Sequence, residues 1–132
     1  MGGFFGVTSR RNCILDVFFG TDYHSHLGTR RGGMAAFDPE RGMQREIHNI
    51  ENAPFRTKFE NIFDEMQGTS VIGCISDSDP QPMLIRTHLG TFAIATVGVV
   101  NNAQELIDKY LSNGSHFDAM TGGKVNSTEL VA

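Results

Sequence analysis

The sequence has only two cysteines, no long apolar run and no block of basic residues, and each shortage excludes a class of protein. The net charge of −4, spread over 132 residues, argues against a nucleic-acid partner. No apolar run is long enough to cross a bilayer, so we expect no membrane partner. Cys13 and Cys74 lie far apart and the first residues do not have the pattern of a signal peptide, so we expect two buried, reduced thiols in a cytoplasmic protein.

The remaining composition is that of an ordinary globular domain. Hydrophobic residues make up 39% of the chain and charged residues 20%, and neither a repeat nor a low-complexity segment is present. We therefore expect one domain that spans residues 1–132.

Runs of β-forming residues bounded by turn residues predict six strands. They cover residues 1–7, 33–37, 44–47, 71–75, 83–86 and 92–100. The last run is apolar apart from Thr96, as expected of a strand that is covered on both faces.

Helical spacing of apolar residues, with capping residues before them, predicts the helices. Asn12 precedes the first of these, Thr57 with Glu60 forms a capping box for the second, and Asn102 with Glu105 precedes the third. The expected buried face of the second is Phe59, Ile62, Phe63 and Met66, and that of the third is Leu106, Ile107, Tyr110 and Leu111.

Asn126 with Glu129 predicts the start of a last helix, but the sequence stops one turn later. We therefore expect a truncated chain, or half of a domain that needs a partner. Together the elements predict an α+β fold of mostly antiparallel sheets with helices as outer layers.

The first strand is unusual because it is apolar from the first residue onwards. Chain termini normally fray unless something holds them in place. Such a start suits a fold in which the α-amino group, or the side chain beside it, does chemistry. We expect residues 1–7 to form an inner strand beside the turn at Val97 and Gly98.

Four stretches, taken in order and spacing, resemble motifs of a known family. They are residues 1–7, 25–33, 71–76 and 95–106, with residues 126–129 as a further matching position. The family is the class II glutamine amidotransferases, and the resemblance is to the amidotransferase domain of amidophosphoribosyltransferases of purine synthesis. It implies an N-terminal nucleophile hydrolase fold, an αββα sandwich, and a phosphoribosyltransferase domain as a partner that is missing from this chain.

The resemblance also implies which positions carry the residues for glutamine hydrolysis in the family. Most of these residues are replaced in this sequence. Gly2 stands where the family has its nucleophilic cysteine, and Ser76 stands where an arginine clamps the glutamine carboxylate. Val97 replaces the asparagine of the oxyanion hole, which leaves only the N–H of Gly98. Ser127 replaces the aspartate that holds the glutamine amine.

In the second motif, Leu27 replaces an arginine, whereas Gly28 is kept. We expect a vestigial pocket lined by Ser76, His26, Gly28 and Ser127, with no catalytic residue, metal or cofactor. The resulting hypothesis is a domain that has lost glutaminase activity and has a structural, regulatory or ligand-binding role.

Other residues could have taken over the chemistry. Cys74 is a candidate thiol, although its apolar neighbours favour a structural role, and Asp77 with Asp79 could hold a metal–diphosphate, although Pro80 favours a turn. Hence one alternative is an enzyme of altered chemistry in the same pocket, which uses Cys74, His26 or the Asp77 and Asp79 pair.

Two further sets of residues have a simpler reading. Asp22, His24 and His26 could bind a metal, although their spacing at a helix end places them on different faces. Arg30 and Arg31 could bind an anion, but a solvated loop is the simpler interpretation.

A last alternative concerns the parent protein. The chain could be a fragment of an ammonia-dependent phosphoribosyltransferase whose activity resides elsewhere. Exposed strand edges favour self-association, so we expect a homo-oligomer.

Overall fold

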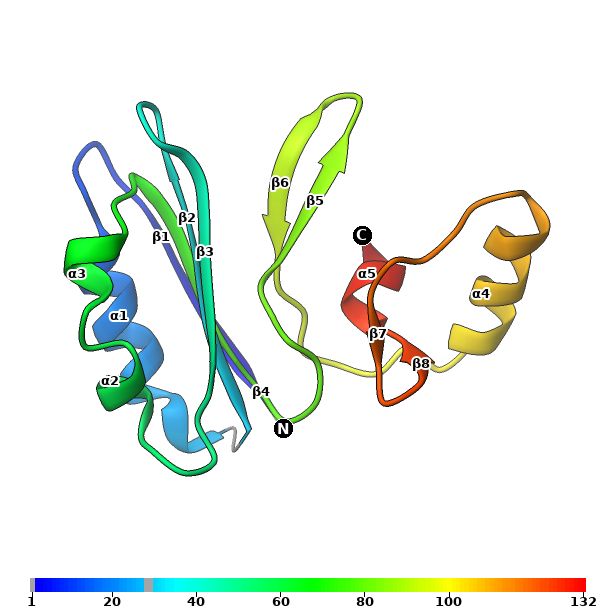
Figure 1. Cartoon of the computed structure of the whole chain (residues 1–132), viewed down its shortest axis with the longest axis horizontal. Coiled ribbons are helices and arrows are strands. Elements are labelled where there is room, and N and C mark those ends of the chain that lie inside the picture. Colours follow the sequence, from blue (N-terminus) through cyan, green and yellow to red (C-terminus); the bar gives the residue numbers. More distant parts are fainter. Residues whose placement is uncertain (1, 28–29) are drawn as a thin grey trace.

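The computed structural model describes residues 2–27 and 30–132, and Figure 1 shows their arrangement. The first half contains β1 (Gly3–Thr8), α1 (Ile14–Tyr23), the short 3-10 helix η1 (Ser25–Leu27), β2 (Arg31–Asp38), β3 (Gly42–Asn49), α2 (Phe55–Lys58) and α3 (Ile62–Glu65). The second half contains β4 (Ser70–Ser76), β5 (Met83–Thr87), β6 (Gly90–Ile94), α4 (Ala103–Ser112), β7 (Met120–Thr121), β8 (Lys124–Val125) and α5 (Ser127–Val131).

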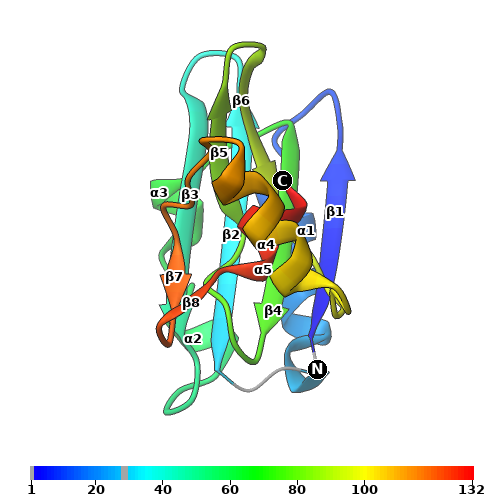
Figure 2. The same ribbon diagram turned by 90° about the vertical axis from the view of Figure 1, so that its right-hand side faces the viewer.

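The main sheet has four antiparallel strands in the order β1-β4-β2-β3. Strand β1 pairs with β4 from Gly3 opposite Ile75 to Thr8 opposite Ser70. The chain start is therefore held in the sheet, as the apolar first residues predicted. The expectation of an inner strand is wrong, because β1 pairs on one side only and forms an edge, with β3 at the opposite edge (Figure 2).

The core lies between this sheet and the helices α1, α2 and α3, which cover one of its faces (Figure 1). Its buried residues are Cys13, Ile14, Val17, Phe18, Met34, Ala36, Phe55, Phe59, Ile62, Met66 and Val71. Three of the four residues expected from the second helix are thus buried. The fourth, Phe63, is 42% exposed and contacts Phe18 edge-on.

The hairpin of β5 and β6 lies over the opposite face of the sheet, and α4 and α5 lie beyond the hairpin (Figure 1). Mixed helices and antiparallel sheets, with helices outermost, confirm the predicted fold class at that level. None of the described helices is long and apolar enough to cross a membrane.

The predicted helix over residues 57–66 is wrong in one respect, because the chain forms two short helices, α2 and α3, instead of one. Neither has a side-chain cap, and Thr57 lies inside α2 instead of before it. Phe59 stacks on Phe55, which lies four residues earlier, with ring centroids 4.3 Å apart, and Ile62 beyond the break is also buried. The core positions are therefore kept although the helix is divided.

The predicted strand over residues 92–100 is also wrong in part. Strand β6 ends at Ile94 and pairs only with β5, and Val99 beyond it is 87% exposed. After Ile94 the apolar segment leaves the hairpin, and there the backbone N–H of Thr96 donates a hydrogen bond to the side chain of Gln81. Its apolar residues therefore do not mark a strand covered on both faces.

The expected buried face of the third helix is wrong as well. Helix α4 has no buried residue, and Tyr110 and Leu111 are 42% and 50% exposed. The helix stands at the outside of the molecule, beside α5, so little of the chain covers it (Figure 1). Asn102 precedes α4 but its side chain makes no cap hydrogen bond.

Candidate functional site

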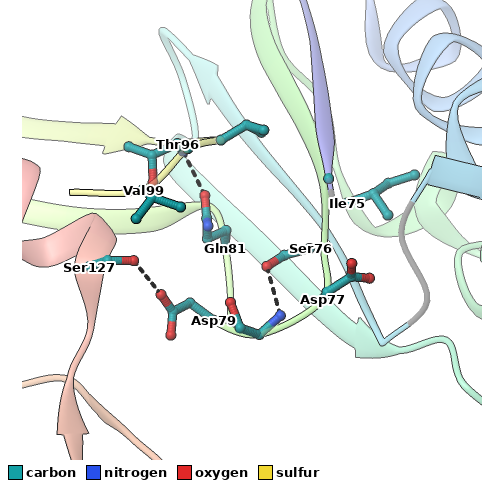
Figure 3. Close-up of a pocket in the computed structure, with 12 residues that line it drawn as sticks. Ile75, Ser76, Asp77, Asp79, Gln81, Thr96, Val99 and Ser127 are labelled. Atoms are coloured by element: carbon teal, nitrogen blue, oxygen red, sulfur yellow. Dashed lines mark hydrogen bonds between the residues drawn. The ribbon is translucent and has the colours of Figure 1, made fainter. Parts of the chain in front are cut away.

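A pocket of about 350 Å³ lies where β1 begins and β4 ends, against the segment after β6 and the start of α5 (Figure 3). Its lining residues come from four separate parts of the chain: Gly2, Ile75, Ser76, Asp77, Ser78, Asp79, Gln81, Thr96, Val97, Gly98, Val99 and Ser127. The volume lies within the usual range for small-molecule sites, about 300–1,000 Å³.

The pairing of β1 with β4 brings the chain start into this pocket. The strand ladder ends with Gly3 opposite Ile75, and Gly2 continues beside Ser76. A Cβ atom placed on Gly2 would overlap the carbonyl oxygen of Ile75. Only glycine therefore fits at position 2 in this arrangement, because the obstructing atom belongs to the backbone of the neighbouring strand.

The loop between β4 and β5 forms one wall of the pocket. The Ser78 N–H donates a hydrogen bond of 3.2 Å to the Ser76 hydroxyl oxygen, which turns the chain directly after β4. Further along, the carbonyl of Gln81 lies against Gly33 of β2, where any side chain would overlap it. The glycine in β2 therefore lets the loop pack closely on the sheet.

Three hydrogen bonds join this loop, α5 and the segment after β6 to one another. The Thr96 N–H donates to the side-chain oxygen of Gln81 at 2.6 Å, and the Ser127 hydroxyl donates to Asp79 Oδ2 at 2.7 Å (Figure 3). The hydroxyls of Thr96 and Thr128 are 2.8 Å apart. These contacts hold segments that lie about the pocket but are far apart in the sequence.

The pocket has acidic but no basic side chains among the described residues that line it. Asp79 is only 8% exposed and Gln81 only 5%, so both are buried polar groups at the pocket wall. The apolar part of the lining comes from Ile75, Val97 and Val99. A site of this composition can bind a small molecule by hydrogen bonds and a negative charge, and its described lining residues offer no positively charged side chain to an anion.

The structure brings together five of the predicted site residues, namely Gly2, Ser76, Val97, Gly98 and Ser127. It places His26 elsewhere. This residue lies in η1, is exposed, and its Nδ1 atom is 3.1 Å from the carbonyl oxygen of Tyr23. It does not line the pocket, because η1 follows α1 on the helical side of the sheet. Gly28 lies outside the described residues.

Cys74 lies behind the pocket. Its side chain is 1% exposed, and its Sγ atom is 3.7 Å from the side-chain oxygen of Gln81. Burial raises the pKa of the thiol to about 12, so it stays protonated and unreactive near neutral pH. The prediction of two buried, unpaired thiols is confirmed for both Cys13 and Cys74.

The other candidate sets have local partners. Asp22 accepts an ion-pair hydrogen bond of 2.7 Å from Arg56, and Arg30 lies 3.6 Å from Glu51. Within residues 2–27 and 30–132, no three His, Cys, Asp or Glu side chains are grouped so that they could hold a metal ion.

Sequence reasoning missed Gln81, Thr96 and Val99 as pocket residues, and it placed Asp79 in a turn without assigning it a partner. One signal was available for Thr96, because it is the single polar residue in an otherwise apolar run. The contact between Asp79 and Ser127 spans 48 positions and has no local sequence signal.

No protein-family model and no curated protein matches the sequence. Solved structures do match it, and they show that the chain has the fold found in amidophosphoribosyltransferase chains, as its motifs predicted.

One similar structure is glutamine phosphoribosylpyrophosphate amidotransferase from B. subtilis, complexed with ADP and GMP. It is 22% identical, with a TM-score of 0.81 over 99% of this chain. Another, described as the allosteric regulatory enzyme of purine biosynthesis, is also 22% identical, with a TM-score of 0.77 over 90% of this chain. This chain spans 28% and 27% of their lengths.

Proposed function

We propose that this chain is a glutamine amidotransferase-like domain of the N-terminal nucleophile hydrolase type that no longer hydrolyses glutamine. In this proposal its pocket binds a small molecule, and the domain has a regulatory or structural role beside a phosphoribosyltransferase domain. The fold likeness to amidophosphoribosyltransferases supports the class, and the composition of the pocket supports the loss of activity.

The observation that carries the proposal is the environment of Gly2. This residue lines the pocket, yet it has no side chain that could attack a carbonyl carbon. The overlap of a Cβ atom with the carbonyl oxygen of Ile75 means that the backbone path itself leaves no space for a nucleophile. The position is therefore unsuited to covalent catalysis for two independent reasons.

The neighbouring groups support the same conclusion. Ser76, whose hydroxyl oxygen accepts the Ser78 N–H, cannot form the two-pronged ion pair that arginine makes with a carboxylate. Val97 provides no amide donor for a developing oxyanion, and loss of one such donor typically lowers the rate about 100- to 1,000-fold.

The alternative of a different reaction in the same pocket has less support. Cys74 would be its nucleophile, but the thiol is buried and its pKa is raised to about 12 by that burial. His26 does not line the pocket and so could not serve as its base.

Two buried thiols suit a reducing compartment, so we place the protein in the cytoplasm as part of this proposal.

The test is to incubate the purified chain with glutamine and to measure ammonia, with the Cys74→Ala variant in parallel. We expect no release above that of buffer from either protein. Ammonia release in proportion to the concentration of the chain would overturn the proposal. Its loss in Cys74→Ala would then identify the thiol that is responsible.

A further inference from the structure

We propose that the pocket binds a small molecule that carries a primary ammonium group and no carboxylate, with Asp79 as the residue that holds the ammonium group. The inference rests on the proposed function, because it names the class of ligand for the same pocket. It is carried by the position of Asp79, by its contact with Ser127 and by the charges of the lining residues.

Asp79 presents a carboxylate at the wall of the pocket. The side chain is 8% exposed, and its Oδ2 atom accepts the hydroxyl proton of Ser127 at 2.7 Å. Among the described residues, Ser127 is the hydrogen-bond partner of this carboxylate, and none forms an ion pair with it. A buried carboxylate is stabilised by a cationic donor, and an ammonium group of a ligand would supply one.

The contact with Ser127 fixes where this charge lies. Ser127 is at the start of α5, and its hydroxyl is directed at Asp79 from the opposite side of the pocket (Figure 3). The negative charge thus comes from the β4–β5 loop and is held in place by a hydroxyl from a segment 48 positions later in the chain. This carboxylate is not at the position that the sequence motifs mark, which is occupied by Ser127 itself.

The same pocket disfavours a carboxylate on the ligand. None of its described lining residues is lysine, arginine or histidine. A ligand carboxylate would be desolvated near Asp79 without a compensating cationic side chain from the described lining residues, and like charges in such a site repel. An amino acid would therefore bind less well than the corresponding amine.

The remaining lining residues suit an organic ammonium better than a metal ion. The described residues provide no group of three His, Cys, Asp or Glu for a metal, whereas Ile75, Val97 and Val99 can contact a short carbon chain. The side-chain oxygen of Gln81 accepts a hydrogen bond from the Thr96 N–H. The amide nitrogen of Gln81 is therefore the group of this side chain that can donate a hydrogen bond to a ligand.

The experiment compares three probes by isothermal titration calorimetry with the intact chain. All three share the side-chain amide of glutamine and differ only in their charged groups. γ-Aminobutyramide has the ammonium group and no carboxylate, glutaramate has the carboxylate and no ammonium group, and glutamine has both. We expect γ-aminobutyramide to bind most tightly, glutamine more weakly and glutaramate not at all. Added salt should weaken the binding of γ-aminobutyramide, because the contact is charged.

Two variants locate the contact. Asp79→Asn should weaken the binding of γ-aminobutyramide about tenfold or more, because it removes the charge from the hydrogen bond. Asp16→Asn makes the same change at an exposed residue of α1, on the other side of the sheet, and should leave the affinity unchanged. If Asp79→Asn does not fold, the order of the three probes on the unmodified chain still decides the question.

Three results would overturn the inference: no binding of γ-aminobutyramide at millimolar concentration, equal or tighter binding of glutamine or glutaramate, or an unchanged affinity in folded Asp79→Asn. Ammonia is measured in the same glutamine samples. Ammonia release would contradict the proposed function, whereas a wrong order of affinities without ammonia release would contradict only the choice of ligand.

Discussion

At the scale of single residues, buried polar groups differ in how fully they are hydrogen-bonded. Asp79 and Gln81 in the pocket wall, and Thr128 next to it, each have a partner on a different segment. In the core, by contrast, the hydroxyl of Thr21 is buried without a hydrogen-bond partner in the described structure. The polar groups around the pocket therefore hold the fold together as well as lining a cavity.

This difference predicts that replacing threonine by valine has different effects on the free energy of unfolding at two fully buried positions. Thr21→Val removes an unsatisfied hydroxyl and should leave the free energy of unfolding unchanged or raise it by up to about 1 kcal/mol. Thr128→Val removes the partner of Thr96 and should lower it by about 1–2 kcal/mol. Urea denaturation of both variants checks this, and a larger loss for Thr21→Val would contradict it.

The burial of Cys74 predicts that the free energy of unfolding depends on pH. Burial raises the pKa of its thiol to about 12 in the folded chain, above the ordinary value of 9.0. Below pH 9 both states keep the proton, so the contribution to stability is complete there. Between those two values only the unfolded chain ionises, and the free energy of unfolding should fall by up to about 1.4 kcal/mol per pH unit.

The measurement is urea denaturation of the unmodified chain and of Cys74→Ala at about pH 8 and about pH 10.5. The variant lacks the thiol, so its stability should fall less between the two conditions. Equal losses in both proteins would show that Cys74 does not titrate as its burial implies.

At the scale of elements, α5 illustrates how a short helix is held at the pocket. Asn126 is 2% exposed, and its side-chain oxygen accepts hydrogen bonds from the N–H groups of Thr128 and Glu129. A five-residue helix is unstable by itself, so this cap fixes the place from which Ser127 reaches Asp79. Asn102 occupies the same position before α4 without such a bond.

The two asparagines that precede α4 and α5 provide a matched pair of substitutions. Asn126→Ala should lower the free energy of unfolding by about 1 kcal/mol or more, because two N–H donors lose their acceptor. Asn102→Ala should change it by less than about 0.5 kcal/mol. Thermal and urea unfolding of the two variants test this, and equal effects would contradict the assignment of the caps.

The sequence predicted elements better than it predicted their limits. The cap at Asn126 and the buried positions Phe59 and Ile62 were predictable, because each depends on a local pattern. The break between α2 and α3 was not, because the local signals, the capping box and the helical spacing of apolar residues, both favour one continuous helix. In the site, the motifs indicated Gly2 and Ser127, but the contact of Ser127 with Asp79 forms only when the chain folds.

At the scale of the whole molecule, the sheet has open edges and the chain leaves apolar side chains exposed. β1 and β3 form the two edges of the four-stranded sheet (Figure 2). Phe4 on β1 is 62% exposed. An open edge with an exposed aromatic residue can pair with another chain. The homo-oligomer remains a prediction, and these features indicate the edge through which it would form.

Sedimentation velocity tests this prediction. We expect the chain to sediment as a dimer that dissociates on dilution, and Phe4→Lys to shift it to the monomer, because a charge on an edge strand opposes pairing. Leu89→Lys makes a similar change at a residue that is 87% exposed at the tip of the hairpin, and should have no effect. A monomer at every concentration would contradict the prediction.

We expect that no atom in this pocket forms a covalent bond with glutamine. Intact-mass spectrometry tests it most directly: the chain is mixed with excess glutamine, quenched in acid after a short interval and weighed. A single species with the mass of the unmodified chain is expected, because Gly2 provides no nucleophile. A second species, heavier by glutamine less ammonia, would contradict it.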